Sequence, residues 1–190
     1  MIKRFLCSLF FLSVCSSLPA CGKAAEKLSE KAVEKAIESQ LEKDGNKSAK
    51  VSLGKEGIKT TVTDASGKVF TSEIGSAKVS EADVGVPFYP GAIMKDGRGT
   101  KITGPDGTVV TVSLESKDDL EKVAEYYRSK MKSMAAGRQM SDMSQAGESA
   151  TLVLMDEKAR NSISVSVSKH SDDARLTSIA IMSSSEKELK

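Results

Sequence analysis

Residues 162–168 alternate strictly between serine and a branched apolar residue, and no other feature of the chain constrains its fold as tightly. Successive side chains of a β-strand point to opposite faces of a sheet. Ile163, Val165 and Val167 therefore share one face, and the serines share the other. A strand with one apolar and one polar face is typical of an antiparallel sheet that is buried on one side only.

Other short segments predict strands that could join the same sheet. Residues 108–115 place Val110, Val112 and Leu114 on one face. Further strands are expected at residues 50–53, 58–63, 68–74, 149–155 and 176–182, and glycine-containing turns are expected at residues 54–57, 64–67 and 104–107. The close spacing of the first three strands predicts a short antiparallel β-meander before the main domain.

A helix is predicted at residues 117–134, directly after the strand at 108–115. Its apolar residues recur at the i, i+3, i+4, i+7 spacing of one helix face: Leu120, Val123, Ala124, Tyr127, Met131 and Met134. Ser116 and Asp119 resemble a capping box at its start. The order of strand, helix and three strands predicts an α+β fold, an antiparallel sheet with one amphipathic helix packed on one face.

Residues 24–43 predict another helix, rich in Ala, Glu, Lys and Leu and ending before Gly45. Its apolar stripe is narrow: Leu28, Val33, Ala36, Ile37 and Leu41. The segment fits a charged tether, one half of a weak coiled coil, or a surface helix resting on the domain. We favour the tether because the stripe carries no aromatic residue. This interpretation predicts that a chain starting near Lys47 keeps the melting temperature.

The first twenty residues are typical of a secretory signal peptide. Lys3 and Arg4 form a cationic head, and residues 5–18 are dominated by apolar side chains. This stretch is too short for a membrane-spanning helix, which needs roughly twenty apolar residues. It has the length of the apolar region of a signal peptide.

The end of this segment, Leu18-Pro19-Ala20-Cys21, resembles the lipobox of bacterial lipoproteins. The resemblance implies a diacylglycerol on the Cys21 thiol, cleavage before Cys21, and usually acylation of the new amino terminus, with palmitate among the acyl groups. Gly22 at the next position implies the outer membrane. The predicted location is therefore the bacterial cell envelope, with the chain attached to the membrane through the lipid on Cys21. The alternative is an ordinary secreted protein with a chance cysteine.

A second resemblance lies in the segment Val86-Pro-Phe-Tyr-Pro-Gly-Ala92. It is similar to a segment found in an uncharacterised group of bacterial lipoproteins, where a strand and a helix ending in an aromatic pair follow it. The helix at 117–134 carries such a pair, Tyr126 and Tyr127. The resemblance covers residues 86–182 and implies no activity. Residues 89–92 fit a type II turn, and we expect Phe88 or Tyr89 to fill the core instead of contacting a ligand.

These patterns divide the chain into five parts. They are a signal peptide at 1–20, a lipidated terminus and helical tether at 21–46, a β-meander at 47–80, an α+β domain at 81–182 and a polar tail at 183–190.

The composition argues against several classes of partner and cofactor. Cleavage after residue 20 removes Lys3 and Arg4, so the 28 Lys plus Arg fall to 26, equal to the 26 Asp plus Glu. This balance gives no support to nucleic-acid binding. Cys21 is the last cysteine of the sequence, so a lipidated chain has no thiol for a disulfide. One histidine without free cysteine is too few ligands for zinc, and no cofactor is expected.

Catalytic motifs are also missing from the sequence. His170 is the single histidine and is followed by Asp172 and Asp173, but no Gly-x-Ser-x-Gly segment presents a serine to it. The phosphate-binding Gly-x-x-x-x-Gly-Lys-Ser pattern does not occur. A hydrolase would require a groove that unites His170 with a serine.

The predicted function is a non-enzymatic binding or scaffolding module of the envelope, with an envelope protein as a possible partner. The main alternative is a periplasmic Cu(I)-binding protein, since Met131, Met134, Met140 and Met143 surround the end of the helix at 117–134 and thioethers are soft ligands that select Cu(I). The simpler explanation of these methionines is core packing and a flexible loop.

Overall fold

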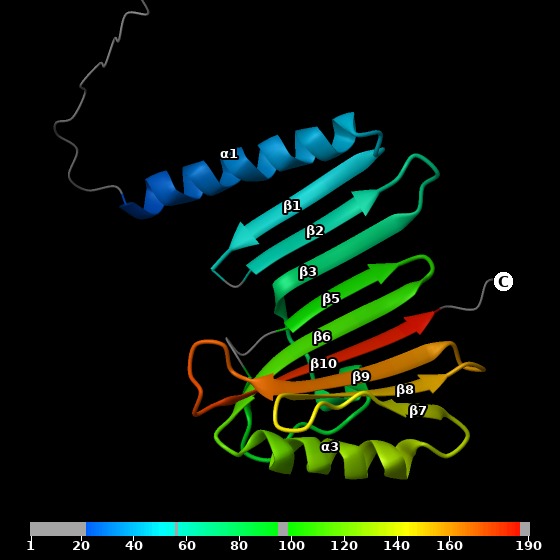
Figure 1. The fold of residues 1–190 in the computed structure, drawn as a ribbon. Helices are drawn as coiled ribbons and strands as arrows, with labels where there is room; N and C mark the ends of the chain where they lie inside the picture. The colour runs from blue at the N-terminus through cyan, green and yellow to red at the C-terminus, as the bar shows by residue number, and fades with distance from the viewer. Residues whose placement is uncertain (1–21, 56, 95–98, 187–190) are drawn as a thin grey trace, which may run out of the picture.

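The structure is a computed structural model that describes residues 22–55, 57–94 and 99–186. Side chains are described from residue 29 onward, so Cys21 and the signal segment lie outside the described residues. Ten strands form one antiparallel sheet in the order β1-β2-β3-β5-β6-β10-β9-β8-β7, and β4 pairs with β6 beside this path. Figure 1 shows the sheet running from α1 and β1 at one end to α3 and β7 at the other.

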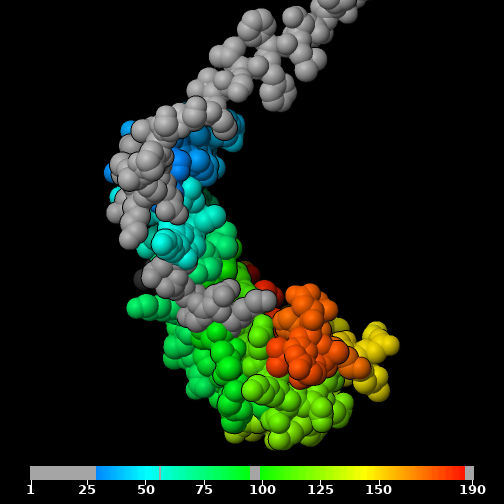
Figure 2. Space-filling model, turned by 90° about the vertical axis from the view of Figure 1, so that its left-hand side faces the viewer, coloured from blue at the N-terminus to red at the C-terminus, as the bar shows by residue number. Residues whose placement is uncertain are grey.

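The elements follow the chain in this order: α1 (Gly22–Lys43), β1 (Ser48–Gly54), β2 (Gly57–Thr63), β3 (Val69–Ala77), α2 (Glu81–Val84), β4 (Ile93–Met94), β5 (Gly99–Gly104), β6 (Gly107–Ser116), α3 (Leu120–Met134), β7 (Gln139–Asp142), β8 (Ser149–Asp156), β9 (Asn161–Lys169) and β10 (Thr177–Glu186). Figure 2 shows an elongated molecule, with the N-terminal strands and α3 at opposite ends.

The predicted α+β class is wrong, because the chain is mostly antiparallel sheet, with 48% of residues in strands and 22% in helices. The predicted β-meander, now β1 to β3, continues into the rest of the sheet through β5. Ser72 of β3 pairs with Ile102 of β5, which in turn pairs with Val109 of β6. The sequence pattern does not predict β5, since its six residues carry a single large apolar side chain and no clear alternation.

The alternation that predicted the central strands is confirmed. Ile163, Val165 and Val167 are buried on one face of β9, as predicted. Val110, Val112 and Leu114 of β6 belong to the same core, together with residues of β8 and β10. β10 extends to Glu186 and pairs with β6 and β9, so the predicted polar tail begins as a strand.

The helix α3 covers the core face of the sheet, against β8 and β9. Five of the six residues of its predicted apolar stripe are buried, and Met134 is partly buried; the five are Leu120, Val123, Ala124, Tyr127 and Met131. The predicted capping box is wrong, because the helix starts one residue after Asp119, whose side chain makes no cap hydrogen bond. Ser116 is instead a buried residue of β6, and its hydroxyl accepts the N–H of Asp118 at 3.1 Å.

The helix α1 is not the free tether that we favoured. It lies along the outer edge of β1 (Figure 1), and three of its glutamates accept backbone N–H groups of that strand. Val51 is only 4% exposed, although β1 is the outermost strand on this side of the sheet. Removing α1 would expose Val51 and the three N–H groups, so the structure no longer supports an unchanged melting temperature.

Candidate functional site

The face of the sheet opposite α3 carries several large apolar side chains that are exposed to solvent. Partners across an antiparallel sheet share a face, so the pairing register identifies its residues. Ile58 lies opposite Ile74, and Val62 lies opposite Phe70. We call this side of the sheet the open face. At β1 it is covered, since Val51 lies on this side and is only 4% exposed.

Charge is almost absent from the open face. By the register, the described strand residues of this face include no Lys and no Arg, and their two carboxylates are Glu115 and Glu186 near its margins. His170 lies beside Glu115, and Arg160 forms an ion pair with Glu186. In a chain with 28% charged residues, this distribution distinguishes the two faces of the sheet.

Apolar side chains gather on the N-terminal half of the open face. We call Ile58, Phe70, Ile74, Ile102 and Val109 the open-face patch. Ile74 is 51% exposed and Ile102 is 46% exposed, so these large side chains are in contact with solvent. Phe70, Ile102 and Val109 also line a shallow hollow of about 360 Å³.

The opposite face of the same strands is mostly charged and polar, although Val69 is an exposed apolar residue there. Lys50, Lys59, Glu73 and Lys101 lie there, and Lys59 pairs with Glu73 at 2.6 Å. The sequence pattern predicts strands for most of this region but does not predict the patch. The signal was present as apolar residues alternating with Lys and Glu, but only the strand register shows that they form one surface.

The C-terminal half of the open face is lined by serines around His170. A hollow of about 220 Å³ lies there, and its polar lining includes Ser113, Ser166, Ser168, Ser171, Ser178, Glu115 and His170. The structure therefore unites His170 with serines, which is the arrangement that a hydrolase would require.

The hydrogen bonds of His170 do not fit a catalytic role. Its Nε2 lies 3.2 Å from Oε1 of Glu115, and its Nδ1 accepts the N–H groups of Asp172 and Asp173 at 3.1 and 3.2 Å. A histidine base needs one ring nitrogen free to take the proton of a serine hydroxyl. Both nitrogens of His170 already have partners, so the geometry favours a histidine that stabilises the turn after β9.

The segment 86–92 docks on α3 through three tyrosines. Ala92 N–H donates to the Tyr89 carbonyl at 3.0 Å, which confirms the predicted turn. Tyr89 is buried, as expected, and its N–H donates to the Tyr127 hydroxyl at 3.0 Å. The Tyr126 hydroxyl donates to the Phe88 carbonyl at 3.1 Å, and the ring of Tyr126 contacts the rings of both other tyrosines edge-on.

Asp118 completes this tyrosine cluster at the start of α3. The Tyr89 hydroxyl donates to the Asp118 carboxylate at 2.6 Å, and Lys122 lies 3.1 Å from the same oxygen. The hydrogen bond to Asp118, together with burial, raises the pKa of Tyr89 to about 12. The Tyr89 hydroxyl and then Lys122 hold the pKa of Asp118 below its usual value. Tyr89 is thus held in the core by its backbone and its hydroxyl.

We expect Tyr127→Phe to destabilise the protein more than Tyr126→Phe. Tyr127 is fully buried, so losing its hydroxyl leaves the Tyr89 N–H without an acceptor, at a cost of about 1–3 kcal/mol. Tyr126 is only partly buried, so water can replace its bond to Phe88, and we expect a loss below about 1 kcal/mol. The stability loss of each variant is measured as the change in its free energy of unfolding in urea. Equal losses would contradict this assignment.

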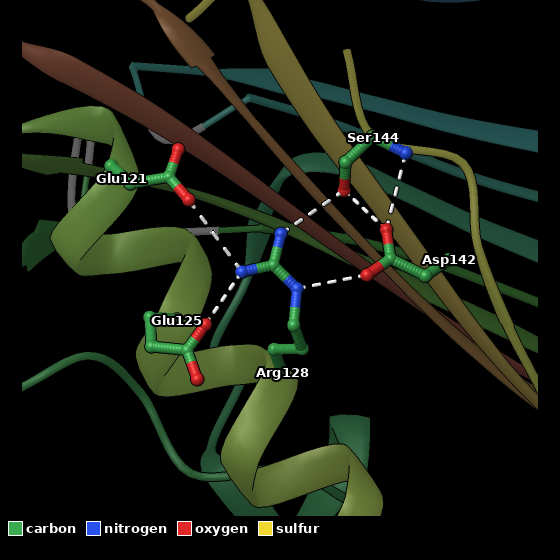
Figure 3. Close-up of polar contacts among 5 residues, drawn as sticks. All are labelled: Glu121, Glu125, Arg128, Asp142 and Ser144. Carbon is green, nitrogen blue, oxygen red and sulfur yellow. Dashed lines mark hydrogen bonds and ion pairs between the residues drawn. The ribbon is translucent and has the colours of Figure 1, made fainter. Parts of the chain in front are cut away.

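Arg128 connects α3 to the sheet edge at β7. Its Nε donates to Asp142 at 2.8 Å and its Nη1 donates to Glu125 at 2.7 Å, while Glu121 lies 3.7 Å from Nη1. Figure 3 shows the guanidinium between these carboxylates, with Nη2 directed at Ser144. The hydrogen bonds from Ser144 and Arg128 lower the pKa of Asp142. Every guanidinium nitrogen has a partner, so this group fixes β7 against α3 and leaves no free nitrogen for an anionic ligand.

The four candidate copper ligands do not form one exposed cluster. Met131 is fully buried, and Met134 and Met140 are partly buried against the same core. Met143 is 60% exposed. Three of the four side chains therefore contribute to packing, which favours the structural explanation.

Within residues 22–55, 57–94 and 99–186, no group of three or more His, Cys, Asp or Glu side chains could hold a metal ion. No helix in this part of the chain is both long enough and apolar enough to cross a membrane. Comparison with protein-family models, curated proteins and solved structures finds no match to the chain.

Proposed function

We propose that the protein is a lipid-anchored, non-enzymatic binding module of the bacterial cell envelope, and that it binds an envelope protein through its open face. The observation that carries this proposal is the open-face patch, a set of large apolar side chains on a surface without Lys or Arg. The lipobox-like residues Leu18 to Cys21 support the anchor, and Gly22 supports the outer membrane.

The distribution of charge indicates the chemistry of the partner. Burying an unpaired charge is costly, whereas burying apolar surface contributes about 25 cal/mol per Å². The open face can therefore be covered by an uncharged, partly apolar protein surface without leaving a lysine or arginine buried. The opposite face carries Lys50 and Lys101, so covering it would bury charged side chains.

The arrangement around His170 supports a binding role over catalysis. Both ring nitrogens are engaged, and serine side chains make up much of the lining of the hollow beside them. Two acyl chains anchor a protein stably where one is marginal. A partner in the same membrane then experiences a high effective concentration, so a weak interface is sufficient.

Photo-crosslinking in intact cells tests this proposal. A photoreactive residue at Ile102, on the open face, should capture a specific envelope protein, whereas one at Thr103, the next residue on the opposite face, should not. The double variant Ile74→Lys with Ile102→Lys should reduce this capture at least about tenfold, because two charges must then be desolvated.

The matched control is Val69→Lys with Thr103→Lys, two positions on the opposite face of β3 and β5 that are not paired directly across the strands, so the new lysines do not face each other. It should keep both the capture and the melting temperature. Equal capture by the two double variants would exclude the open face as the binding surface.

A further inference from the structure

The glutamates of α1 form a ladder along the edge of β1. Every second residue of an edge strand directs its N–H away from the sheet, and three such groups of β1 donate to carboxylates of α1. The N–H of Leu53 donates to Glu34 at 2.6 Å, that of Val51 to Glu38 at 2.8 Å, and that of Ala49 to Glu42 at 3.3 Å.

The ladder depends on a match between two repeats. Four residues of an α-helix rise about 6 Å, and two residues of an antiparallel strand extend about 6.8 Å. Glutamates at every fourth helix position therefore meet every second strand amide. The sequence carries glutamates at this interval, a repeat that is separate from the apolar stripe: Glu26, Glu30, Glu34, Glu38 and Glu42.

The carboxylate oxygens occupy the positions that carbonyl oxygens of a neighbouring strand would take. An uncovered edge of this kind is a template for pairing with another strand. We propose that α1 is a displaceable cover over a strand-accepting edge, and that β1, once uncovered, pairs antiparallel with β1 of a second copy of this chain.

The sequence of β1 fits pairing with itself. In an antiparallel register centred on Val51, the two Val51 residues lie opposite each other, and Ala49 lies opposite Leu53. Lys50 lies opposite Ser52, so no like charges face each other within Ser48–Gly54. Partners in an antiparallel pair share a face, so this pairing would join the two open faces into one continuous surface with few charges.

Two triple variants of the full-length chain test the proposal. One replaces Glu34, Glu38 and Glu42 with Ala, and the other replaces them with Gln. Both remove three negative charges, but Gln keeps a side-chain carbonyl that can accept the N–H groups. Alanine has the higher helix propensity, so loss of the contact in the Ala variant cannot be attributed to a weaker helix.

In dilute solution, we expect the amides of Ala49, Val51 and Leu53 to exchange with deuterium about tenfold faster in the Ala variant than in the Gln variant. Lys50 and Ser52, whose amides face β2, serve as internal controls. At high concentration in detergent, sedimentation measures the protein mass of each species. We expect the Ala variant to have twice the protein mass of the Gln variant.

Adding Ala49→Pro to the Ala variant should abolish this dimer, because proline lacks the outward N–H yet is tolerated on an edge strand. Unchanged exchange at the three amides would overturn the role of α1 as a cover. Faster exchange without dimerisation, or a dimer that persists with Ala49→Pro, would overturn the pairing of β1 with itself.

Discussion

Val123→Asp is expected to abolish stable folding of the chain. Val123 has no solvent-exposed surface and lies on the side of α3 that packs against β8 and β9. An aspartate there would lose the burial of the valine, about 1.5–3 kcal/mol, and would place a carboxylate in the core at a further cost of several kcal/mol. Since domains of this size are stable by roughly 5–15 kcal/mol, the combined loss is comparable to the whole stability.

Ser129→Asp is the matched control, because Ser129 lies on the exposed side of the same helix. A substitution at such a position should change the free energy of unfolding by less than about 0.5 kcal/mol. Urea unfolding followed by circular dichroism compares the two variants. Similar midpoints would show that α3 does not bury the face assigned to it.

Cys21→Ser is expected to abolish lipid attachment completely. The predicted anchor is a thioether, and a serine hydroxyl cannot replace the thiol in forming it. The variant should remain an uncut precursor that incorporates no labelled palmitate, whereas the unchanged chain should be labelled and cleaved. Since two acyl chains make membrane binding stable, the labelled chain should sediment with the membrane fraction.

Cys15→Ser provides the control within the same segment. Cys15 follows Val14 and lacks the small residue before it that the lipobox-like sequence has at Ala20. This variant should be processed and labelled normally. Labelling that survives Cys21→Ser, or is lost with Cys15→Ser, would place the modification at a different residue and refute the assignment.

Local periodicity determined the central strands and the helix α3. Ile163, Val165 and Val167 alternate with serines, and Val123 and Tyr127 repeat with the helical period, so each set has one possible inward face. Any fold that contains these strands and this helix must bury the same apolar faces. The lipobox-like residues before Gly22 also depend on sequence alone, and the described structure neither adds to them nor tests them.

The tertiary structure decided the features that depend on long-range pairing. β5 has too few apolar residues to be predicted alone, and yet its hydrogen bonds to β3 and β6 extend one sheet across the molecule and overturn the α+β class. The same pairing brings Ile74 and Ile102, which are 28 residues apart in the sequence, into one exposed patch. Sequence patterns show which residues alternate but not which strands are neighbours.

The same limit applies to single side chains. The sequence places His170 near two aspartates, but only the folded chain shows both ring nitrogens occupied, by Glu115 and by two backbone amides. The sequence likewise shows a charged helix, but only the folded chain shows that Glu38 accepts the N–H of Val51 in β1. Hydrogen-bond partners distant along the chain are set by strand register and helix docking, and these follow from burying the core as a whole, which no local segment determines.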